Sequence, residues 1–501
     1  MAYEYETQDT THGKAIELNS SGDSVEALSS EYTRWMDESV LPRSLYAGTM
    51  AMRLKTTEFL PKHPLESDTA YKLRINQSVL FNVFRKTASF LAGQVFQADV
   101  VFKKGVTQDF KDLMKRCDAK ENSVNVFAKR VFMNGLAKGV SHILVDAPRV
   151  PDGQVLSLAD EKKLGIRPYL KEVRPEDVIG WIVDEEGTLL QVRLIESVPK
   201  RYGKYGYDTI KRIRVYNNDG TWELWEFDVK KDGTAFLVDE GQLSYPGIPI
   251  ATFIPGEEMS AMTGETPLMD LAWLNLNHWQ SYSDQRNILS VGRVPILFGR
   301  HITVEQMPVG VAAMVTSEED GSDIKYVEIE GRAIEAGAAD LTDLETKMAL
   351  WGLQQLIPRS GNMTATEKAL TSRESNSALG TWAIEYESCL QNAFSIFQQM
   401  RGEQFPDEGL ELNKEYNLGV IDSETGNLLL GMKKEGILSS PATFEEFRRR
   451  GVVDESLEWE DIEAEKEKER MNEPDPLAGI GSMFGNQDQN QNQDQNQNTE
   501  E

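Results

Sequence analysis

Hydrophobic and polar positions in the first third of the chain follow a helical period. A helix is predicted to begin near Tyr32, and a long helical stretch is predicted over 67–96, where apolar positions recur three, four or seven residues apart. Two further helices are predicted over 107–118 and 123–139, with Ser123 as the N-cap of the second. The repeating positions in the long stretch are Leu73, Leu80, Phe84, Thr87 and Leu91.

After Gly139 the pattern changes to an alternation of apolar and polar residues. A short strand is predicted over 141–148, and five alternating segments follow between 167 and 240. Turn sequences separate them, such as Asn218-Asp219-Gly220. These features predict an antiparallel β region of about five or six strands. Residues up to about 260 therefore form one α+β unit, with helices first and the sheet second.

A helical pattern returns at Thr266, which is a good N-cap residue and is followed by Pro267 at the first helical position. The predicted helix continues for ~24 residues, or about 36 Å, and ends near Gly292. A short segment with β character then reaches about Gly337. One face of the helix carries Leu268, Ala272, Leu276, Trp279 and Tyr282.

Two more helices are predicted before residue 402. The first begins at Asp340 as N-cap, carries Leu341, Leu344, Met348 and Trp351 on one face, and is stopped by Pro358. A polar loop follows. The last helix has apolar residues alternately four and three positions apart, a pattern typical both of a long helix packed on its own domain and of a two-stranded coiled coil. These residues are Leu379, Ala383, Tyr386, Leu390, Ala393, Phe397 and Met400.

The charge of the chain changes which partners are expected. The formal net charge is −28. Residues 402–501 hold 25 acidic and 9 basic residues, a net −16, so the other 401 residues carry −12. A monomer of this charge repels a phosphate backbone, so any contact with DNA must be local or loose. No run of about 18 apolar residues exists, which excludes a helical membrane span, and the polar N-terminus does not resemble a secretory signal.

Sequence motifs of catalysis are absent. There is no GxxxxGK[ST] phosphate-binding loop and no GxSxG, and the five histidines form no HExxH motif. The run GIGSMFG at 479–485 falls one residue short of the dinucleotide fingerprint. Cys117 and Cys389 are too isolated for a disulfide framework or a zinc site, and we expect small buried residues in a reducing compartment. Neither a cofactor nor a metal site is predicted.

Charged clusters allow two interpretations each. Arg448, Arg449 and Arg450 are expected to complement a helix C-terminus, with contact to DNA as the alternative. The acidic run 458–469 is expected to be a solvated helix face rather than a metal site. A basic cluster with interleaved Tyr202, Tyr205 and Tyr207 favours a solvated hairpin or a subunit contact over single-stranded nucleic-acid binding. The basic residues are Lys200, Arg201, Lys204, Lys211, Arg212 and Arg214.

Between 266 and 401 the predicted order is helix, small β module, helix, flexible loop and long helix, and this order resembles the portal proteins of tailed bacteriophages. The segment GETPLMDLAWLNLNHWQSYSDQRNIL at 264–289 is similar to a portal stem segment. Three shorter segments resemble the portal wing: FLPK at 59–62, TASFLAGQVF at 87–96 and YLKEVRPEDVIGW at 169–181. The resemblance spans residues 35–469.

The resemblance implies a portal-type α+β fold with a wing, long stem helices, a small α/β clip and a helical crown. The C-terminal part is expected to hold two short crown helices, the first starting at Ser440-Pro441 and ending at Gly451. The implied organisation is a disordered N-terminal arm (1–30), wing (31–264), first stem helix (265–291), clip (292–338), second stem helix (339–357), tunnel loop (358–374), long wing helix (375–402), crown (403–471) and disordered Asn/Gln-rich tail (472–501).

By resemblance, the protein is a structural component of the virion and not an enzyme. It would form a homo-oligomeric ring, in this family usually of twelve subunits, at one capsid vertex, after assembly in the host cytoplasm. Double-stranded DNA would pass through it, and it would contact the terminase large subunit, a head–tail adaptor protein, and the major capsid and scaffold proteins. The tunnel-loop residues expected to touch DNA are Arg359, Ser360, Gly361, Asn362, Met363, Thr364 and Lys368.

Two other functions stay open at the level of sequence. One is a metal-dependent nucleic-acid-processing enzyme, because a two-metal site needs only three or four carboxylates and the chain has 81 acidic residues. The other is a different structural phage protein, such as an adaptor or a scaffold. Adaptors are usually far shorter, and scaffolds are mostly helical without a β region like that at 173–240.

Overall fold

The computed structural model is mixed helix and sheet, and it divides into two compact units, Met1–Lys414 and Glu415–Glu501, which are described separately. Eleven sequence segments are described. They are residues 24–148, 167–227, 235–292, 296–300, 320–327, 331–353, 365–407, 409–414, 423–449, 453 and 459–472. Within these segments, the side chains at 291–292, 365–377 and a few other positions are not described.

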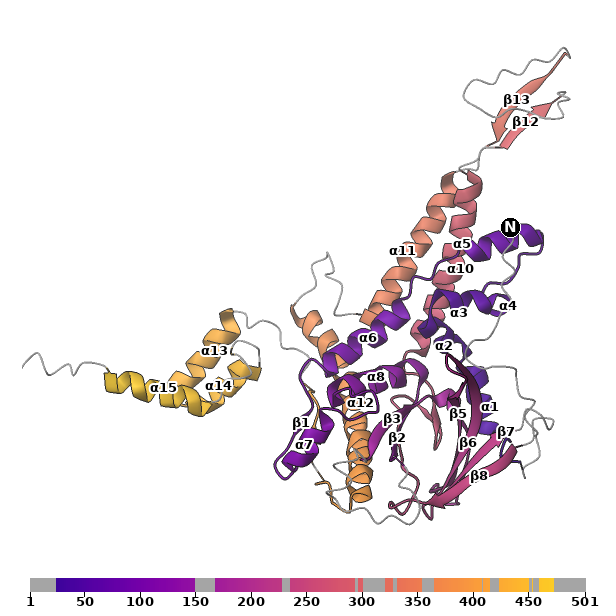
Figure 1. Cartoon of the computed structure of the whole chain (residues 1–501). Helices are drawn as coiled ribbons and strands as arrows, with labels where there is room; N and C mark the ends of the chain where they lie inside the picture. The colour runs from indigo at the N-terminus through magenta and orange to yellow at the C-terminus, as the bar shows by residue number, and fades with distance from the viewer. Residues whose placement is uncertain are drawn as a thin grey trace, which may run out of the picture. The chain divides into compact units, whose positions relative to one another are not determined.

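Short helices make up the start of the first unit (Figure 1). They are α1 (Ser30–Glu38), α2 (Val40–Ala47), α3 (Thr49–Leu54), α4 (Thr56–Phe59), α5 (Asp68–Gln77), α6 (Val83–Val95), α7 (Gln108–Met114) and α8 (Val124–Lys138). Residues 24–30, which the sequence assigned to a disordered arm, belong to the folded unit. Ala27 is buried, the Ser29 hydroxyl accepts a hydrogen bond from the Tyr32 N–H, and the Ser29 N–H donates to the Ile179 carbonyl (3.1 Å). Residues 1–23 lie outside the described residues.

The prediction of one helical stretch over 67–96 was wrong, because the chain leaves the helix between α5 and α6. Ser78 ends α5, with its hydroxyl donating to the Arg74 carbonyl (2.7 Å). Asn82 begins α6 as an N-cap that accepts from the Arg85 N–H (2.9 Å). The residue pattern that suggested continuity includes Leu73, which is 55% exposed.

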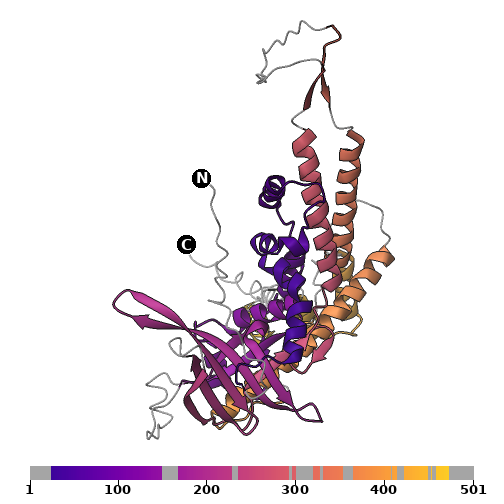
Figure 2. The same cartoon turned by 90° about the vertical axis from the view of Figure 1, so that its right-hand side faces the viewer.

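Two antiparallel sheets form the lower part of this unit (Figures 1 and 2). The larger has the order β4-β5-β6-β7-β8 and the smaller the order β3-β2-β9, which confirms the predicted antiparallel region. The strands are β2 (Ser141–Asp146), β3 (Tyr169–Val173), β4 (Val178–Val183), β5 (Leu189–Tyr202), β6 (Gly206–Asn217), β7 (Thr221–Phe227), β8 (Ala235–Gln242) and β9 (Ile250–Phe253), with a 3-10 turn at Pro175–Asp177 and short strands β10 (Glu258–Ser260) and β11 (Thr263–Gly264).

Beyond the sheets, the chain forms α10 (Met269–Gly292), the hairpin strands β12 (Ile296–Arg300) and β13 (Asp323–Val327), α11 (Gly331–Leu353) and α12 (Ala365–Met400). Both later helices begin before their predicted starts at 340 and 375. In α11 the added turns are rich in alanine, the strongest helix former, so Asp340 lies inside the helix instead of capping it. The predicted α/β clip is, in its described part, a β hairpin.

The long helix α12 packs on its own unit, as one of the two sequence interpretations proposed. Met400, the last residue of the predicted series, is half-buried, and the other six are buried: Leu379, Ala383, Tyr386, Leu390, Ala393 and Phe397. The Tyr386 hydroxyl donates to the Ala128 carbonyl (2.9 Å), and its ring lies 4.8 Å from that of Phe253 on β9. After α12, strand β14 (Leu410–Glu411) pairs with β1 (Val101–Phe102), so residues 403–414 belong to this unit rather than to a crown.

The second unit contains α13 (Ser423–Lys434), α14 (Ser440–Arg449) and α15 (Trp459–Asn472). The sequence had predicted two helices here and missed α13. Ser439, one residue before the predicted start, caps α14 through a hydrogen bond from the Ala442 N–H to its hydroxyl (3.3 Å). The rings of Phe444 and Trp459 lie 5.7 Å apart and hold α14 against α15. The Asn/Gln-rich tail lies outside the described residues.

Candidate functional site: the two-helix arm

Helices α10 and α11 lie side by side and run in opposite directions, with the β12–β13 hairpin between them in the chain (Figures 1 and 2). We call this helix pair the two-helix arm. The apolar part of its core lies largely on the predicted faces, but Trp351 is 62% exposed, and Leu341 and Tyr282 are only half-buried. The buried apolar residues are Leu271, Ala272, Leu276, Trp279, Leu344 and Met348.

Two glycines let the arm pack closely. A Cβ placed on Gly337 would lie 2.1 Å from Gln285 Oε1 on the facing helix. A Cβ on Gly352 would lie 2.6 Å from Thr87 Oγ1 on α6 and 2.9 Å from Leu271 Cδ2 on α10. At both positions a larger residue would force a facing side chain to move, so glycine lets α11 approach α10 and α6 closely.

Polar side chains set how the two helices align. Gln285 on α10 donates through Nε2 to the Ile334 carbonyl on α11 (2.9 Å). Further along the arm, His278 Nε2 lies 3.3 Å from Glu345 Oε1. The His278 side chain is 1% exposed and stacks on Tyr282 at a ring distance of 6.0 Å. Because buried polar groups need partners, these two contacts fix one alignment of α11 on α10.

The root of the arm is tied to the break between α5 and α6. Asn275 on α10 accepts a hydrogen bond from the Phe84 N–H (3.0 Å) and donates to the Phe81 carbonyl (2.9 Å). Ser283 shares a hydrogen bond of 2.9 Å with the Ser78 hydroxyl. The backbone groups freed where the helix breaks are therefore bound by α10. No sequence motif marks Asn275 for this role.

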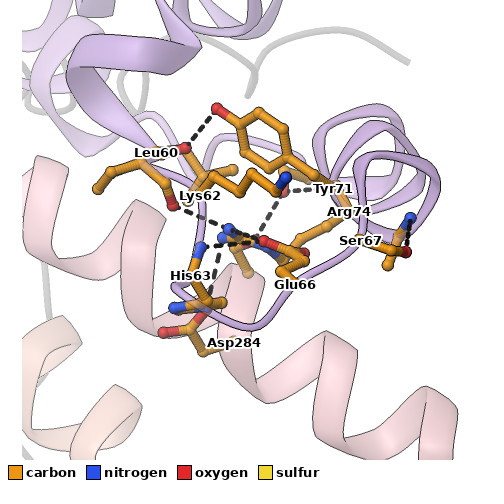
Figure 3. A network of polar contacts seen from close by, with 12 residues as sticks. Leu60, Lys62, His63, Glu66, Ser67, Tyr71, Arg74 and Asp284 are labelled. Carbon is orange, nitrogen blue, oxygen red and sulfur yellow. Dashed lines mark hydrogen bonds and ion pairs between the residues drawn. The ribbon is translucent and has the colours of Figure 1, made fainter.

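Figure 3 shows a charged network that joins the 60–67 segment and α5 to α10. Arg74 donates to both carboxylate oxygens of Glu66 (2.9 and 2.8 Å) and to the Pro61 carbonyl (2.9 Å). Asp284 on α10 lies 3.6 Å from the Arg74 guanidinium and 3.1 Å from His63 Nε2. The Arg74 hydrogen bonds lower the pKa of Glu66 below its ordinary value, and the same bonds raise the pKa of Arg74.

The polar groups of the arm and its root hold elements of the fold together. Within the part of the chain that the structure describes, no group of three or more His, Cys, Asp or Glu residues is placed to hold a metal ion. Both cysteines are buried, and burial raises each thiol pKa to about 12. No described helix is long and apolar enough to cross a membrane.

The predicted tunnel-loop residues cannot be placed. Arg359, Ser360, Gly361, Asn362, Met363 and Thr364 lie outside the described residues, and so does the side chain of Lys368, whose backbone belongs to α12. The structure therefore leaves their role a prediction. Arg448 pairs with Glu445 of its own helix (2.9 Å).

The basic cluster predicted near residue 205 is divided by the fold. Arg212 and Arg214 lie on the sheet, where they pair with Glu226 (2.6 Å) and Glu196 (3.3 Å). In contrast, Lys200, Arg201 and Lys204 lie at the exposed end of the β5–β6 hairpin. The sequence interpretation therefore treated as one cluster two sets of cations that have different surroundings in the fold.

Comparison with known proteins gives one family match, to a domain of unknown function (DUF4055) over residues 267–400, which include α10, the hairpin, α11 and α12. No curated protein matches the chain.

Three of the similar solved structures come from gene transfer agent particles. A chain in the virion of a native particle has 14% identity and a TM-score of 0.39, covering 74% of this chain and 89% of that chain. A chain in the neck of an empty particle, computed with C6 symmetry, has 13% identity and a TM-score of 0.41, covering 77% and 94%. One in the neck of a native particle, computed with C12 symmetry, has 13% identity and a TM-score of 0.39, covering 79% and 91%. With TM-scores below 0.5, these likenesses do not establish a shared fold.

Proposed function

We propose that this chain is the portal subunit of a tailed bacteriophage. It forms a homo-oligomeric ring at one capsid vertex, through which double-stranded DNA is packaged and later ejected. The observation that carries the proposal is the order of elements from α10 to α12: a long helix, a β hairpin, an antiparallel partner helix and a long helix packed back on the first unit. This is the stem, clip, stem and wing order that the sequence resemblance implies.

The arm has the properties that a rigid channel element needs. Its apolar core, its two close glycine contacts and its interhelical hydrogen bonds hold α10 and α11 in one alignment. Asn275 and the Arg74 network fix its root. A rigid arm repeated around a closed ring lines an axial channel, since cyclic symmetry uses one heterologous contact many times.

The charge of the arm suits a channel in which DNA slides. Helix α11 carries four acidic residues and two basic ones, and Lys347 is paired with Asp343 (2.7 Å). Twelve copies of a chain of net charge −28 give about −336 for the ring. A surface without excess positive charge does not hold a phosphate backbone.

In this proposal the chain is not an enzyme, and the terminase large subunit drives packaging. The hairpin end of the arm contacts terminase first and the head–tail adaptor afterwards, and the ring also meets the capsid and scaffold proteins.

The oligomeric state tests the proposal directly. Native mass spectrometry and negative-stain images of the purified full chain are expected to give closed rings with a hole wide enough for double-stranded DNA. A stable monomer or dimer across the micromolar range would overturn the assignment.

The tunnel loop needs a separate test. Deleting residues 361–365 is expected to impair DNA packaging or retention while rings still form. If packaging and retention are unchanged, the loop does not contact DNA as proposed.

A further inference from the structure

The β5–β6 hairpin projects beyond its own sheet, as the magenta hairpin in Figure 2 shows. Its two strands pair from Gln191 opposite Asn217 to Tyr202 opposite Gly206. The neighbouring strands pair with only part of this hairpin. In the described residues, the pairing of β4 with β5 extends no further than Leu194, and the pairing of β7 with β6 begins at Arg212. The end of the hairpin is therefore a two-stranded ribbon, which is marginally stable in water by itself.

The end of this ribbon, residues 200–208, is basic and aromatic, and we call it the ribbon tip. Tyr205 and Tyr207 are 87% and 71% exposed, and Lys204 Nζ lies 5.0 Å from the centre of the Tyr205 ring. Lys200 and Arg201 are exposed as well. Within the described part of the chain, these three cations form no ion pair with a carboxylate. Exposed tyrosine beside unpaired cations is the composition of a contact surface.

A cavity of about 470 Å³ opens on the same unit, between α1, α2, α4 and the start of α10. Its walls include Trp35, Val40, Leu41, Phe59 and Met269. Trp273 also lines it and is 55% exposed on α10. The volume lies within the range of about 300–1,000 Å³ that is usual for binding pockets.

Acidic residues surround this apolar cavity. Asp37, Glu38, Glu58 and Glu265 line it and are exposed. Its one lysine, Lys138, is bound to Glu176 at 2.7 Å, so it does not offset them. Among the described residues, Asp37 and Glu265 form no ion pair, which leaves two carboxylates to meet a cationic partner.

We propose that the ribbon tip of one copy docks in the cavity of a second copy, placing Tyr205 against Trp273 and the tip cations among the acidic residues. The inference rests on the proposed ring and names its subunit contact. The ribbon tip and the cavity are different surfaces of one chain, and their charges and ring chemistry are complementary. A contact of this heterologous kind, repeated by rotation, closes into a ring.

Charge reversal tests the contact in the full chain. The triple variant Lys200→Glu, Arg201→Glu and Lys204→Glu is expected to raise the concentration needed for ring formation by roughly ten-fold or more. The matched control Lys104→Glu, Lys120→Glu and Lys129→Glu makes the same charge change at exposed residues elsewhere and is expected to assemble normally. Adding Asp37→Lys, Glu58→Lys and Glu265→Lys to the ribbon variant is expected to restore rings.

Disulfide trapping gives a second readout that does not depend on assembly strength. An equal mixture of a Tyr205→Cys chain and a Trp273→Cys chain is expected to give a crosslinked heterodimer on mild oxidation. The native Cys117 and Cys389 are buried, so they do not compete.

The outcomes distinguish a failure of the proposed subunit contact from a failure of the proposed ring. If the unaltered chain forms no rings, the proposed function fails. If it forms rings but the ribbon variant assembles equally well, or neither the crosslink nor the restoration is seen, the contact is wrong and the ring stands. Normal rings that have lost salt-sensitive DNA binding would show that the ribbon tip contacts nucleic acid instead.

Discussion

Arg74 and Glu66 form a bidentate ion pair in the network of Figure 3, and their side chains are only 3% and 7% exposed. Arg74→Ala leaves a buried carboxylate without its partner, and we expect a loss of about 3–5 kcal/mol in the free energy of unfolding, measured by urea denaturation. Arg34→Ala breaks an exposed pair with Glu38, at 67% and 49% exposure, and should change the free energy of unfolding far less. Equal losses would mean that the buried network contributes little.

Acid pH should weaken the fold through His142, which is fully buried on β2. Burial lowers the pKa of His142 from 6.5 to about 3. Between these values the unfolded chain binds a proton that the folded chain does not, so stability is complete above pH 6.5 and declines as the pH falls toward 3, by about 1.4 kcal/mol per pH unit.

The check on His142 is a pair of stability curves measured from about pH 7.5 down to about pH 5, a range that spans the ordinary histidine pKa. Relative to His142→Gln, which does not titrate, the unaltered chain should lose stability steadily below pH 6.5. Parallel curves would show that His142 is protonated in both states or in neither.

Close packing of the arm predicts opposite effects of the same substitution at two glycines. Gly352→Ala brings a methyl group against Thr87 and Leu271, and we expect a loss of about 1–3 kcal/mol in unfolding free energy. Gly380→Ala in α12 meets no atom within 4 Å and should stabilise by up to ~1 kcal/mol through helix propensity. Thermal unfolding distinguishes them, and a stabilising Gly352→Ala would contradict the packing of α11 on α6.

The hydrogen bonds of Asn275 predict that its loss would destabilise the start of α6 locally. Asn275→Ala removes two hydrogen bonds to backbone groups and leaves the Phe84 N–H unpaired, while the Phe81 carbonyl keeps the Val83 N–H (3.0 Å), and we expect a cost of about 1–3 kcal/mol. Hydrogen exchange at Phe84 should accelerate strongly. Asn277→Ala, at an exposed position of the same helix, should leave that exchange unchanged. If both variants exchange alike, α10 does not anchor the break.

Particular residues show how far the sequence pattern could be followed. The apolar period from Leu379 to Phe397 predicted a buried helix face, and every one of those positions is buried. The same reasoning failed at Leu73, which is exposed, because Ser78 ends one helix and Asn82 begins another. The break between these helices is held by hydrogen bonds to α10, which lies far along the chain. Asp340 failed as an N-cap because alanine-rich turns before it extend the helix.

By itself the sequence determined the alternation of helical and extended segments, the antiparallel character of the sheet, and the order of helix, β module, helix and long helix that carries the proposed function. Periodicity and turn residues act over a few neighbouring positions, so they can be seen in the chain. The tertiary structure alone decided the rest: the Arg74 network, the anchoring by Asn275, the ribbon that projects past its sheet and the acidic cavity. Each of these depends on residues that only folding brings together, so no local pattern could predict them.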